Sequence, residues 1–365
     1  MDWTAVRDEF PALARWTFLN SATFGQVPRR AVAALNAHLE HRDSLACHDF
    51  LDWFEDHERL RGKIARLINA SADDIAYVPN SASGLALLFN GLDWREGDEV
   101  LTLPGEFPNQ VYAPSARGVR LIEAPWPELL DRLSSRTRLV AVSWLNYSTG
   151  FRVPLEELAE AVRRTGAWFY LDATQGLGPL QLDFSAIRPH LLAVNCYKWM
   201  LTPNGVGFLA VAPELRAAMR PLAVGWRSHH DWRNVANLHH GPPVFSERAE
   251  KYEGGMLPSS LLYALEAVVD WMLELTPAVL QDRALSLAAA AAEILERRGG
   301  VVAHRDSPII AARFEGRDAP ALSAALKERR ILTSARHGHL RVSTHFYNNE
   351  EDLARLDEAL AALLA

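Results

Sequence analysis

Seven short apolar segments between residues 73 and 213 constrain the fold of this chain more than any other feature. Helical stretches such as Leu85–Leu92 and Pro154–Thr165 lie between them. Apolar strands that alternate with helices predict a parallel, doubly wound α/β sheet, whose ligand binds beyond the carboxyl ends of the strands. The segments are Ile75–Val78, Glu99–Leu103, Val119–Glu123, Leu139–Trp144, Trp168–Leu171, Leu191–Val194 and Gly207–Val211.

The pattern changes after Pro258. A long helical region precedes three apolar runs and two further helices, which predicts a smaller α+β domain with helices on one face. Because 365 residues are too many for one core, we expect a helical segment 1–70 that packs with the small domain or a partner subunit, a large domain 71–256 and a small domain 257–365. The elements after Pro258 are Ser259–Arg298, Val301–His304, Ile309–Phe314, Ala319–Arg329, His339–Ser343 and Asn349–Leu364.

A carboxylate and a lysine follow two of the predicted strands of the large domain. Asp172 ends the strand that begins at Trp168, and Lys198 comes shortly after the strand Leu191–Val194. Pyridoxal 5'-phosphate (PLP) needs this pair, because a lysine amine forms its Schiff base and a carboxylate keeps its pyridine nitrogen protonated. Either residue alone is equally consistent with a surface lysine or a helix-capping aspartate.

Two further features are typical of a PLP site. Ser81, Ala82 and Ser83 lie at a turn from strand to helix, where free backbone N–H groups bind a phosphate. Phe107 follows the strand Glu99–Leu103 and is placed to cover a ring. A plain N-cap serine and a core aromatic residue explain the same positions. Two other side chains follow the strand Leu139–Trp144 and can reach the phenolic oxygen of PLP, namely Asn146 and Tyr147.

Five motifs in order along the chain resemble those of the class V aminotransferase family. This family of fold-type I PLP enzymes includes cysteine desulfurases, kynureninases and isopenicillin N epimerase-like proteins. The similarity covers nearly the whole chain and implies a large domain with a mostly parallel mixed sheet between helices, plus a smaller α+β C-terminal domain. The motifs lie at Phe18–Arg29, Leu171–Gln175, Tyr197–Gly207, Tyr252–Gly255 and Leu340–Asn348.

The resemblance implies a role for each matching position. Lys198 would be the aldimine lysine, Asp172 the partner of the pyridine nitrogen, Gln175 a hydrogen-bond donor to the phenolic oxygen and Phe107 the stacking ring. Arg341 would clamp the substrate carboxylate, because a guanidinium forms paired hydrogen bonds with that group. The remaining implied contacts are Ser81, Ala82, Asn195 and Tyr197 to the phosphate, Gly255 and Met256 to the phosphate from the neighbouring subunit of a homodimer, and Asn20 to the substrate.

The chain also departs from the family pattern. Ala82 replaces a usual hydroxyl residue and Met256 a usual threonine, so two side-chain contacts to phosphate are expected to be missing. The stretch before Arg341 holds no cysteine, and neither Cys47 nor Cys196 takes that place. We therefore expect no cysteine-nucleophile desulfuration. Transamination and elimination are favoured on an amino-acid substrate that the sequence does not name, and epimerisation remains the alternative.

Two readings outside this chemistry are disfavoured. A nucleotide-binding protein that uses Ser81–Gly84 as its phosphate loop would need a GxxxxGK[ST] or GxGxxG motif, and neither is present there. A non-catalytic relative of the family would have no need to retain both Lys198 and Asp172.

The segment from Gly225 to His240 is rich in His, Trp and Arg and is not explained by these motifs. We expect no metal there, because its adjacent histidines lack the one-face helical spacing of a zinc site. A solvated loop is one interpretation. The other is a substrate-specificity loop that brings Trp226 or Arg227 close to the substrate.

Composition excludes several other classes. The net charge of -7 argues against nucleic acid or an anionic membrane as a partner. No apolar run approaches the roughly 20 residues that span a bilayer. The chain has only two cysteines and no CxxC pair, so neither a disulfide nor a zinc framework is expected. These features predict a reduced, cytoplasmic protein.

Overall fold

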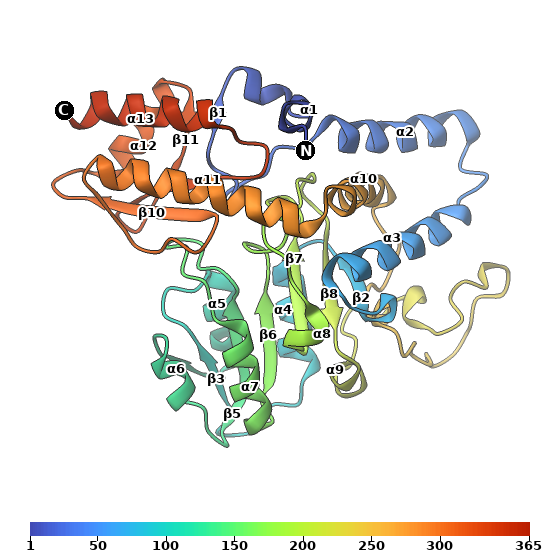
Figure 1. Ribbon diagram of the computed structural model, residues 1–365. Coiled ribbons are helices and arrows are strands. Elements are labelled where there is room, and N and C mark those ends of the chain that lie inside the picture. Colours follow the sequence, from blue (N-terminus) through green and yellow to red (C-terminus); the bar gives the residue numbers. More distant parts are fainter.

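A seven-stranded mixed sheet forms the centre of the computed structural model, which describes residues 1–365 (Figure 1). The strand order is β2-β8-β7-β6-β5-β3-β4, and β8 alone runs antiparallel to both of its neighbours. The fold predicted from the sequence is thereby confirmed, including the mostly parallel sheet. The strands are β2 (Ile75–Val78), β3 (Glu99–Thr102), β4 (Arg120–Glu123), β5 (Thr137–Ser143), β6 (Trp168–Asp172), β7 (Leu191–Asn195) and β8 (Gly207–Val211).

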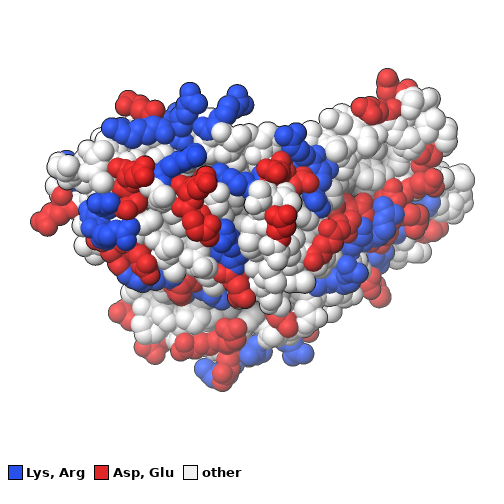
Figure 2. Space-filling model, turned by 45° about the horizontal axis from the view of Figure 1, so that its top comes forward, with Lys and Arg blue, Asp and Glu red and all other residues white.

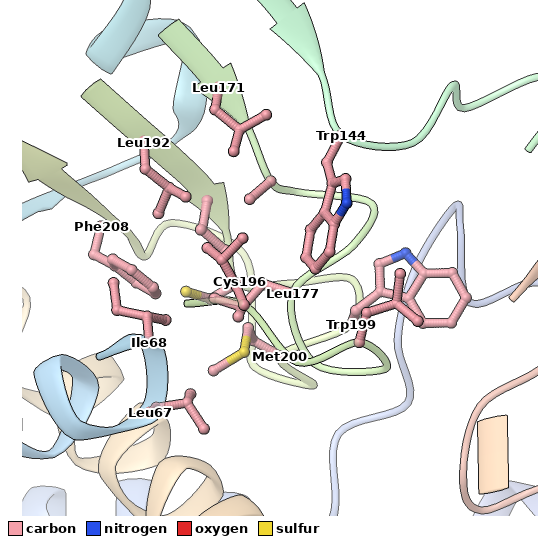
Figure 3. Packing of buried hydrophobic residues seen from close by; sticks show 14 of the residues in the cluster. Leu67, Ile68, Trp144, Leu171, Leu177, Leu192, Cys196, Trp199, Met200 and Phe208 are labelled. Atoms are coloured by element: carbon pink, nitrogen blue, oxygen red, sulfur yellow. The ribbon is translucent and has the colours of Figure 1, made fainter. Parts of the chain in front are cut away.

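Both faces of this sheet are buried. Side chains alternate between the two faces of a strand, so Leu192 packs with one hydrophobic cluster and Leu191 with another. Figure 3 shows the first cluster, in which Leu171, Leu192 and Phe208 face Ile68. The helices of this domain are α4 (Ser81–Gly91), α5 (Pro108–Arg117), α6 (Glu128–Asp131), α7 (Leu155–Thr165), α8 (Phe184–Ile187) and α9 (Pro213–Ala218).

The C-terminal part forms a four-stranded antiparallel sheet with helices on one face. Its order is β12-β13-β10-β9, and the apolar side chains of β10 and β13 pack against helices α11, α12 and α13. The sequence-based assignment missed β12. The elements are α10 (Ser259–Leu275), α11 (Pro277–Arg297), β9 (Gly300–Val302), β10 (Ile309–Phe314), α12 (Ala319–Glu328), β12 (Ser334–Arg336), β13 (His339–Ser343) and α13 (Glu350–Leu364).

The long helical region expected over Ser259–Arg298 is two helices. Thr276 has φ +64°, in the left-handed region, and Pro277 follows it at the first position of α11. Proline lacks the N–H that would continue α10, which explains the break.

The N-terminal segment packs largely on C-terminal elements. Strand β1 (Thr17–Phe18) pairs in parallel with β11 (Ile331–Leu332), and Arg7 forms an ion pair with Asp352 at 2.8 Å. Helices α2 (Arg29–Leu45) and α3 (Asp52–Ile68) lie against α10, and the short α1 (Trp3–Asp8) precedes them. The division of the chain at residues 70 and 256 stays a prediction.

The surface carries charges of both signs. Figure 2 shows Lys and Arg interspersed with Asp and Glu over the visible face, rather than in one field of a single sign. Many of these charges are paired, as in Arg297–Asp357 at 2.9 Å. No helix is both long enough and apolar enough to cross a bilayer.

We expect the sheet core to dominate stability. Val140 in β5 is fully buried, whereas Val301 in β9 is 73% exposed. Val140→Ala should lower the free energy of unfolding by about 2 kcal/mol, since burying a valine side chain contributes roughly that much. Val301→Ala, the matched control in a strand, should cost less than about 0.5 kcal/mol. Denaturant unfolding monitored by fluorescence measures both, and equal losses would contradict the assignment of this core.

Candidate active site

A cavity at the carboxyl edge of the large sheet collects most of the predicted site residues. Strand β8 reverses direction, so β2 points the same way as β7 and delivers Ser81 to this edge. The other contributions come from the ends of β3, β5, β6 and β7. The lining residues are Ser81, Phe107, Ser143, Tyr147, Asp172, Thr174, Gln175, Asn195, Tyr197 and Lys198.

Lys198 is a buried amine without a protein partner. Its side chain forms no hydrogen bond or ion pair, and Nζ lies 5.5 Å from the centre of the Phe107 ring. Burial lowers the pKa of Lys198 from 10.5 to about 8, against the opposing charge of Asp172, and Arg341 and Arg336 lower it further. The unprotonated, nucleophilic fraction of the amine is therefore minor near neutral pH but far larger than for an ordinary lysine.

Asp172 faces the same cavity and has no cationic side chain within ion-pair distance. Its Oδ1 accepts a hydrogen bond from the backbone N of Thr174 at 2.9 Å. Burial raises the pKa of Asp172, while hydrogen bonds from Thr174 and the charge of Lys198 lower it. Two unlike charges thus share one buried cavity without touching, which leaves room between them for a group that contacts both.

The first turn of α4 forms the phosphate end of the cavity. Asn195 fixes Ser81 twice, since its Oδ1 accepts from the Ser81 backbone N at 2.8 Å and its Nδ2 donates to the Ser81 Oγ at 2.9 Å. Asn80 caps the amide of Ser83 at 2.9 Å. The amide of Ala82 lies between these two and is one of the N–H groups that a helix leaves without an internal acceptor. Neither Ala82 nor Ser83 lines the cavity.

Gln175 and Asn146 are largely committed to the protein. Nε2 of Gln175 donates to the carbonyl of Ala22 at 3.0 Å, and its Oε1 accepts from Trp199 at 2.8 Å. One N–H of Gln175 remains for a ligand. Asn146 donates to the carbonyl of Gly105 at 2.9 Å, caps its own loop and lines a neighbouring cavity instead.

Arg341 is a buried guanidinium with no carboxylate. It is 1% exposed and donates to the carbonyl of Tyr147, to Oγ1 of Thr23 at 2.6 Å and to Oδ1 of Asn20 at 3.4 Å. Its Nε has no partner. Burial lowers the pKa of Arg341 to about 9. Since a buried charge is costly unless it is paired, this site calls for an anion.

The structure does not bring four other predicted residues into this cavity. Met256 is 53% exposed at the surface, next to Gly255. Arg227 is buried elsewhere, where it pairs with Glu253 at 2.9 Å and stacks on the ring of Trp232 at 3.7 Å. Trp226 is also partly exposed.

Sequence reasoning missed three residues at this site, Glu106, Ser143 and Thr174. Glu106 is buried and accepts hydrogen bonds from both the backbone N of Ser143, at 2.7 Å, and its Oγ, at 2.5 Å. Burial raises the pKa of Glu106 to about 7, in spite of those hydrogen bonds. Signals existed for these residues, because Glu106 precedes Phe107, Ser143 is the last residue but one of the predicted strand Leu139–Trp144, and Thr174 lies between Asp172 and Gln175.

These groups fit PLP. A buried amine, an aromatic ring beside it, an unpaired carboxylate across the cavity and a helix N-terminus match the aldehyde, ring, pyridine nitrogen and phosphate of that cofactor. The fold and the site therefore define a PLP-dependent enzyme of the fold-type I class.

Comparison with known proteins identifies the family. Residues 17–356 match the family model described as aminotransferase class-V, so the chain belongs to that family, and its cofactor is PLP.

Full-length relatives carry several activities. Isopenicillin N epimerase of Streptomyces clavuligerus is 28% identical, with 99% of this chain and 98% of the relative covered. A probable cysteine desulfurase of Methanothermobacter thermautotrophicus is 23% identical, and the match covers 97% of this chain and 96% of the relative. An uncharacterized aminotransferase, YcbU, of Bacillus subtilis is 24% identical, and the match covers 98% of this chain and 96% of the relative.

Solved structures share the fold. A mutant of C-DES with glycine covalently linked to its PLP cofactor superposes with a TM-score of 0.89 at 23% identity, covering 97% of this chain and 98% of that one. The apo cysteine desulfurase of Thermococcus onnurineus NA1 superposes with a TM-score of 0.87 at 19% identity, covering 99% of this chain and 98% of that one.

We predict that Lys198 is reactive at a lower pH than the other lysines of the cofactor-free protein. Because its pKa is about 8, acetylation of Lys198 should rise with pH around a midpoint near that value. Lys63 is the internal control, since ion pairs with Glu266 and Asp270 raise its pKa above 10.5. Peptide mass spectrometry after brief labelling gives both profiles, and coincident midpoints would contradict the assignment.

Proposed function

We propose that this protein acts on the α-amino group of an amino acid and removes the Cα proton, in a transamination or an elimination. One observation carries the proposal. The buried, partner-free amine of Lys198 and the unpaired carboxylate of Asp172 line one cavity. The uncompensated guanidinium of Arg341 lies beside it, bonded to the carbonyl of the lining residue Tyr147 and near enough for its charge to lower the pKa of Lys198. An amino acid offers a carboxylate to Arg341 and a reacting centre to Lys198.

Each residue then has a defined task. Arg341 binds the substrate carboxylate and so orients Cα, with Thr23 and Asn20 holding the guanidinium. Lys198 accepts and returns a proton through Nζ. Asp172 retains a proton on the pyridine nitrogen by its negative charge. PLP, when bound, supplies an electron sink for the negative charge that develops at Cα.

Phe107 and Asn195 support binding of the cofactor in this proposal. The ring of Phe107 covers one side of the cavity and packs edge-on against Tyr147, with ring centres 5.4 Å apart. Asn195 holds Ser81 at the phosphate end, next to the amide of Ala82. The backbone N–H of Ala82 is then available to the phosphate in place of the hydroxyl that Ala82 lacks.

A cysteine nucleophile plays no part in the proposed reaction. Cys196 is fully buried, burial raises the pKa of its thiol, and it packs in the hydrophobic core, while Cys47 lies in the turn after α2. Neither lines the cavity. Relatives are named as desulfurases as well as an epimerase, so the test includes sulfur transfer directly.

Epimerisation is the second candidate. It is favoured by the relative named isopenicillin N epimerase, which is matched over almost its full length. An epimerase returns the proton to the opposite face of Cα and releases no keto acid, whereas transamination and elimination both yield one.

We also propose a homodimer with sites at the subunit interface. Exposed apolar side chains concentrate on α2, the turn after it and the segment 222–256, which project from the same side of the molecule (Figure 1). Met256 and Trp226 belong to this surface, and the loop bearing Trp226 packs on the backbone of Gly254. Exposed apolar side chains that gather on one side of the molecule support burial by a second copy.

Purified protein with PLP is expected to be yellow, and borohydride reduction should fix a pyridoxyl mass on the Lys198 peptide. Lys198→Ala should lower the turnover rate by a factor of about 10⁴ or more. The variant should still bind PLP through the groups at the N-terminus of α4. Asp172→Asn should lower kcat strongly, since it removes the charge that retains the pyridine proton. Glu315→Gln, an exposed carboxylate far from the cavity, is the matched control.

Product assays assign the reaction. Amino acids are incubated with the enzyme, and keto acid, ammonia, sulfide and the opposite enantiomer are measured. Keto acid with an aminated acceptor indicates transamination, and keto acid with ammonia indicates elimination. A colourless protein that PLP does not restore would sink the proposal, and persulfide on Cys196 or Cys47 would overturn the exclusion of a cysteine nucleophile.

The dimer is tested by a charge placed in the apolar surface. Leu51 in the turn before α3 is 46% exposed. Leu51→Glu should shift sedimentation from dimer to monomer and lower specific activity, because a carboxylate is costly to bury in an apolar interface. Val301→Glu, on the small domain, should change neither. Wild-type protein that sediments as a monomer and remains active refutes the shared site.

A further inference from the structure

A row of basic residues lies beside Arg341 on the four-stranded sheet. His339 is two residues from Arg341 on β13, so both side chains project from the same face. Arg336 of β12 pairs opposite His339 in the strand register. Arg313 of β10 lies on the other side, where its Nε donates to Nε2 of His339 at 3.1 Å.

These arginines have no acidic partner. The opposite face of the sheet is apolar and covered by helices, so the cationic face is the one turned away from that core. Neither Arg313, Arg336 nor Arg341 forms an ion pair with Asp or Glu. By contrast, other arginines of this domain do, as in Arg298 with Asp357 at 2.7 Å. Arg317 also lacks an acidic partner but lies exposed elsewhere, so the distinguishing feature of this face is that three unpaired guanidinium groups share it.

Arg313 lines a cavity of about 470 Å³, and Arg336 lies beyond His339 from it in the strand register. Four basic residues line it, and no Asp or Glu does, while Asn146 and Ser148 add neutral polar groups. Its volume is more than enough to admit the distal part of a small ligand. The four basic residues are His304, Arg313, His337 and His339.

Tyr147 separates this cavity from the cofactor cavity. It lines the cofactor cavity beside Phe107, and its hydroxyl is hydrogen-bonded to Nε2 of His337 at 2.9 Å. Its carbonyl accepts from Arg341. Tyr147 alone would thus lie between this cavity and a substrate held at Arg341 by its α-carboxylate.

His339 takes up only one nitrogen, Nε, of the Arg313 guanidinium. His339 Nε2 accepts from Arg313, and Nδ1 faces the carbonyl of Arg336 at 3.3 Å, which defines a neutral ring. Burial and the charge of Arg313 lower the pKa of His339 accordingly. Arg313 donates from Nη2 to the carbonyl of His337 at 3.3 Å, and its Nη1 has no protein acceptor. Arg336 donates from Nη1 to the carbonyl of Ala335 at 2.7 Å, and its Nη2 has none, so each guanidinium keeps a terminal nitrogen for a carboxylate.

We propose that Arg313 and Arg336, with His337, form a second anion site that binds the distal carboxylate of the substrate. The substrate class is then the dicarboxylic amino acids. The inference rests on the proposed function, in which Arg341 binds the α-carboxylate. An amide in place of the distal carboxylate would leave both cations uncompensated, so the site discriminates by charge rather than by size.

The test compares acids with amides of the same shape. kcat/KM is measured for glutamate against glutamine and for aspartate against asparagine, with 2-aminoadipate as a longer acid. Wild-type enzyme should favour at least one acid over its amide by about tenfold or more, the ratio that a difference of about 1.4 kcal/mol gives. Arg313→Gln and Arg336→Gln should each reduce that ratio at least severalfold by lowering the value for the acid. Arg317→Gln, an exposed arginine that donates to the carbonyl of Leu364, should leave the ratio unchanged.

A binding measurement that needs no turnover separates the two proposals. Calorimetry on cofactor-free protein should give tighter binding for glutarate than for butyrate, and Arg313→Gln should remove the difference. An enzyme that acts on amino acids yet treats acids and amides alike overturns the second anion site alone. If no amino acid reacts while glutarate still binds more tightly and responds to Arg313→Gln, the second site stands and the proposed reaction falls.

Discussion

The separation of two buried, unlike charges is the constraint on which the rest of the site depends. Lys198 and Asp172 leave adjacent strands, β7 and β6, at one sheet edge and enter the same cavity without forming an ion pair. Burial lowers the pKa of the amine and raises that of the carboxyl, so each charge is held at a cost. A ligand that contacts both groups relieves that cost, and this is why the site binds a cofactor with complementary ends.

The N-terminal segment joins the two domains around this cavity. Gly25 donates its backbone N–H to the carbonyl of Tyr197. A Cβ at Gly25 would clash with the carbonyl oxygen of Lys198, so only glycine allows this close approach. Ala22 accepts from Gln175 and donates its own N–H to Ser343 of β13. Lys198 and Arg341 are therefore held relative to each other by a segment remote from both in sequence.

Much of this arrangement was predictable from local patterns. The strands of the large domain alternate with helices, and Ser81, Phe107, Asp172 and Lys198 follow strand ends directly, so their meeting at one edge follows from parallel pairing. Glu106 and Arg336 were not found, because their importance comes from partners far away in sequence. Glu106 matters through Ser143, and Arg336 through its position opposite His339 on a strand of three residues.

The sequence by itself determined the class of fold and the cofactor and predicted the lysine that would bond to it, since these depend on strand ends and on motifs a few residues long. Tertiary structure alone decided which charges lack a partner. Arg227 and Arg341 look alike in the sequence, but Arg227 meets Glu253 in the core while Arg341 meets only neutral oxygens beside the cavity. Whether a buried cation is structural or awaits a ligand depends on its neighbours in space, and long-range packing sets those neighbours.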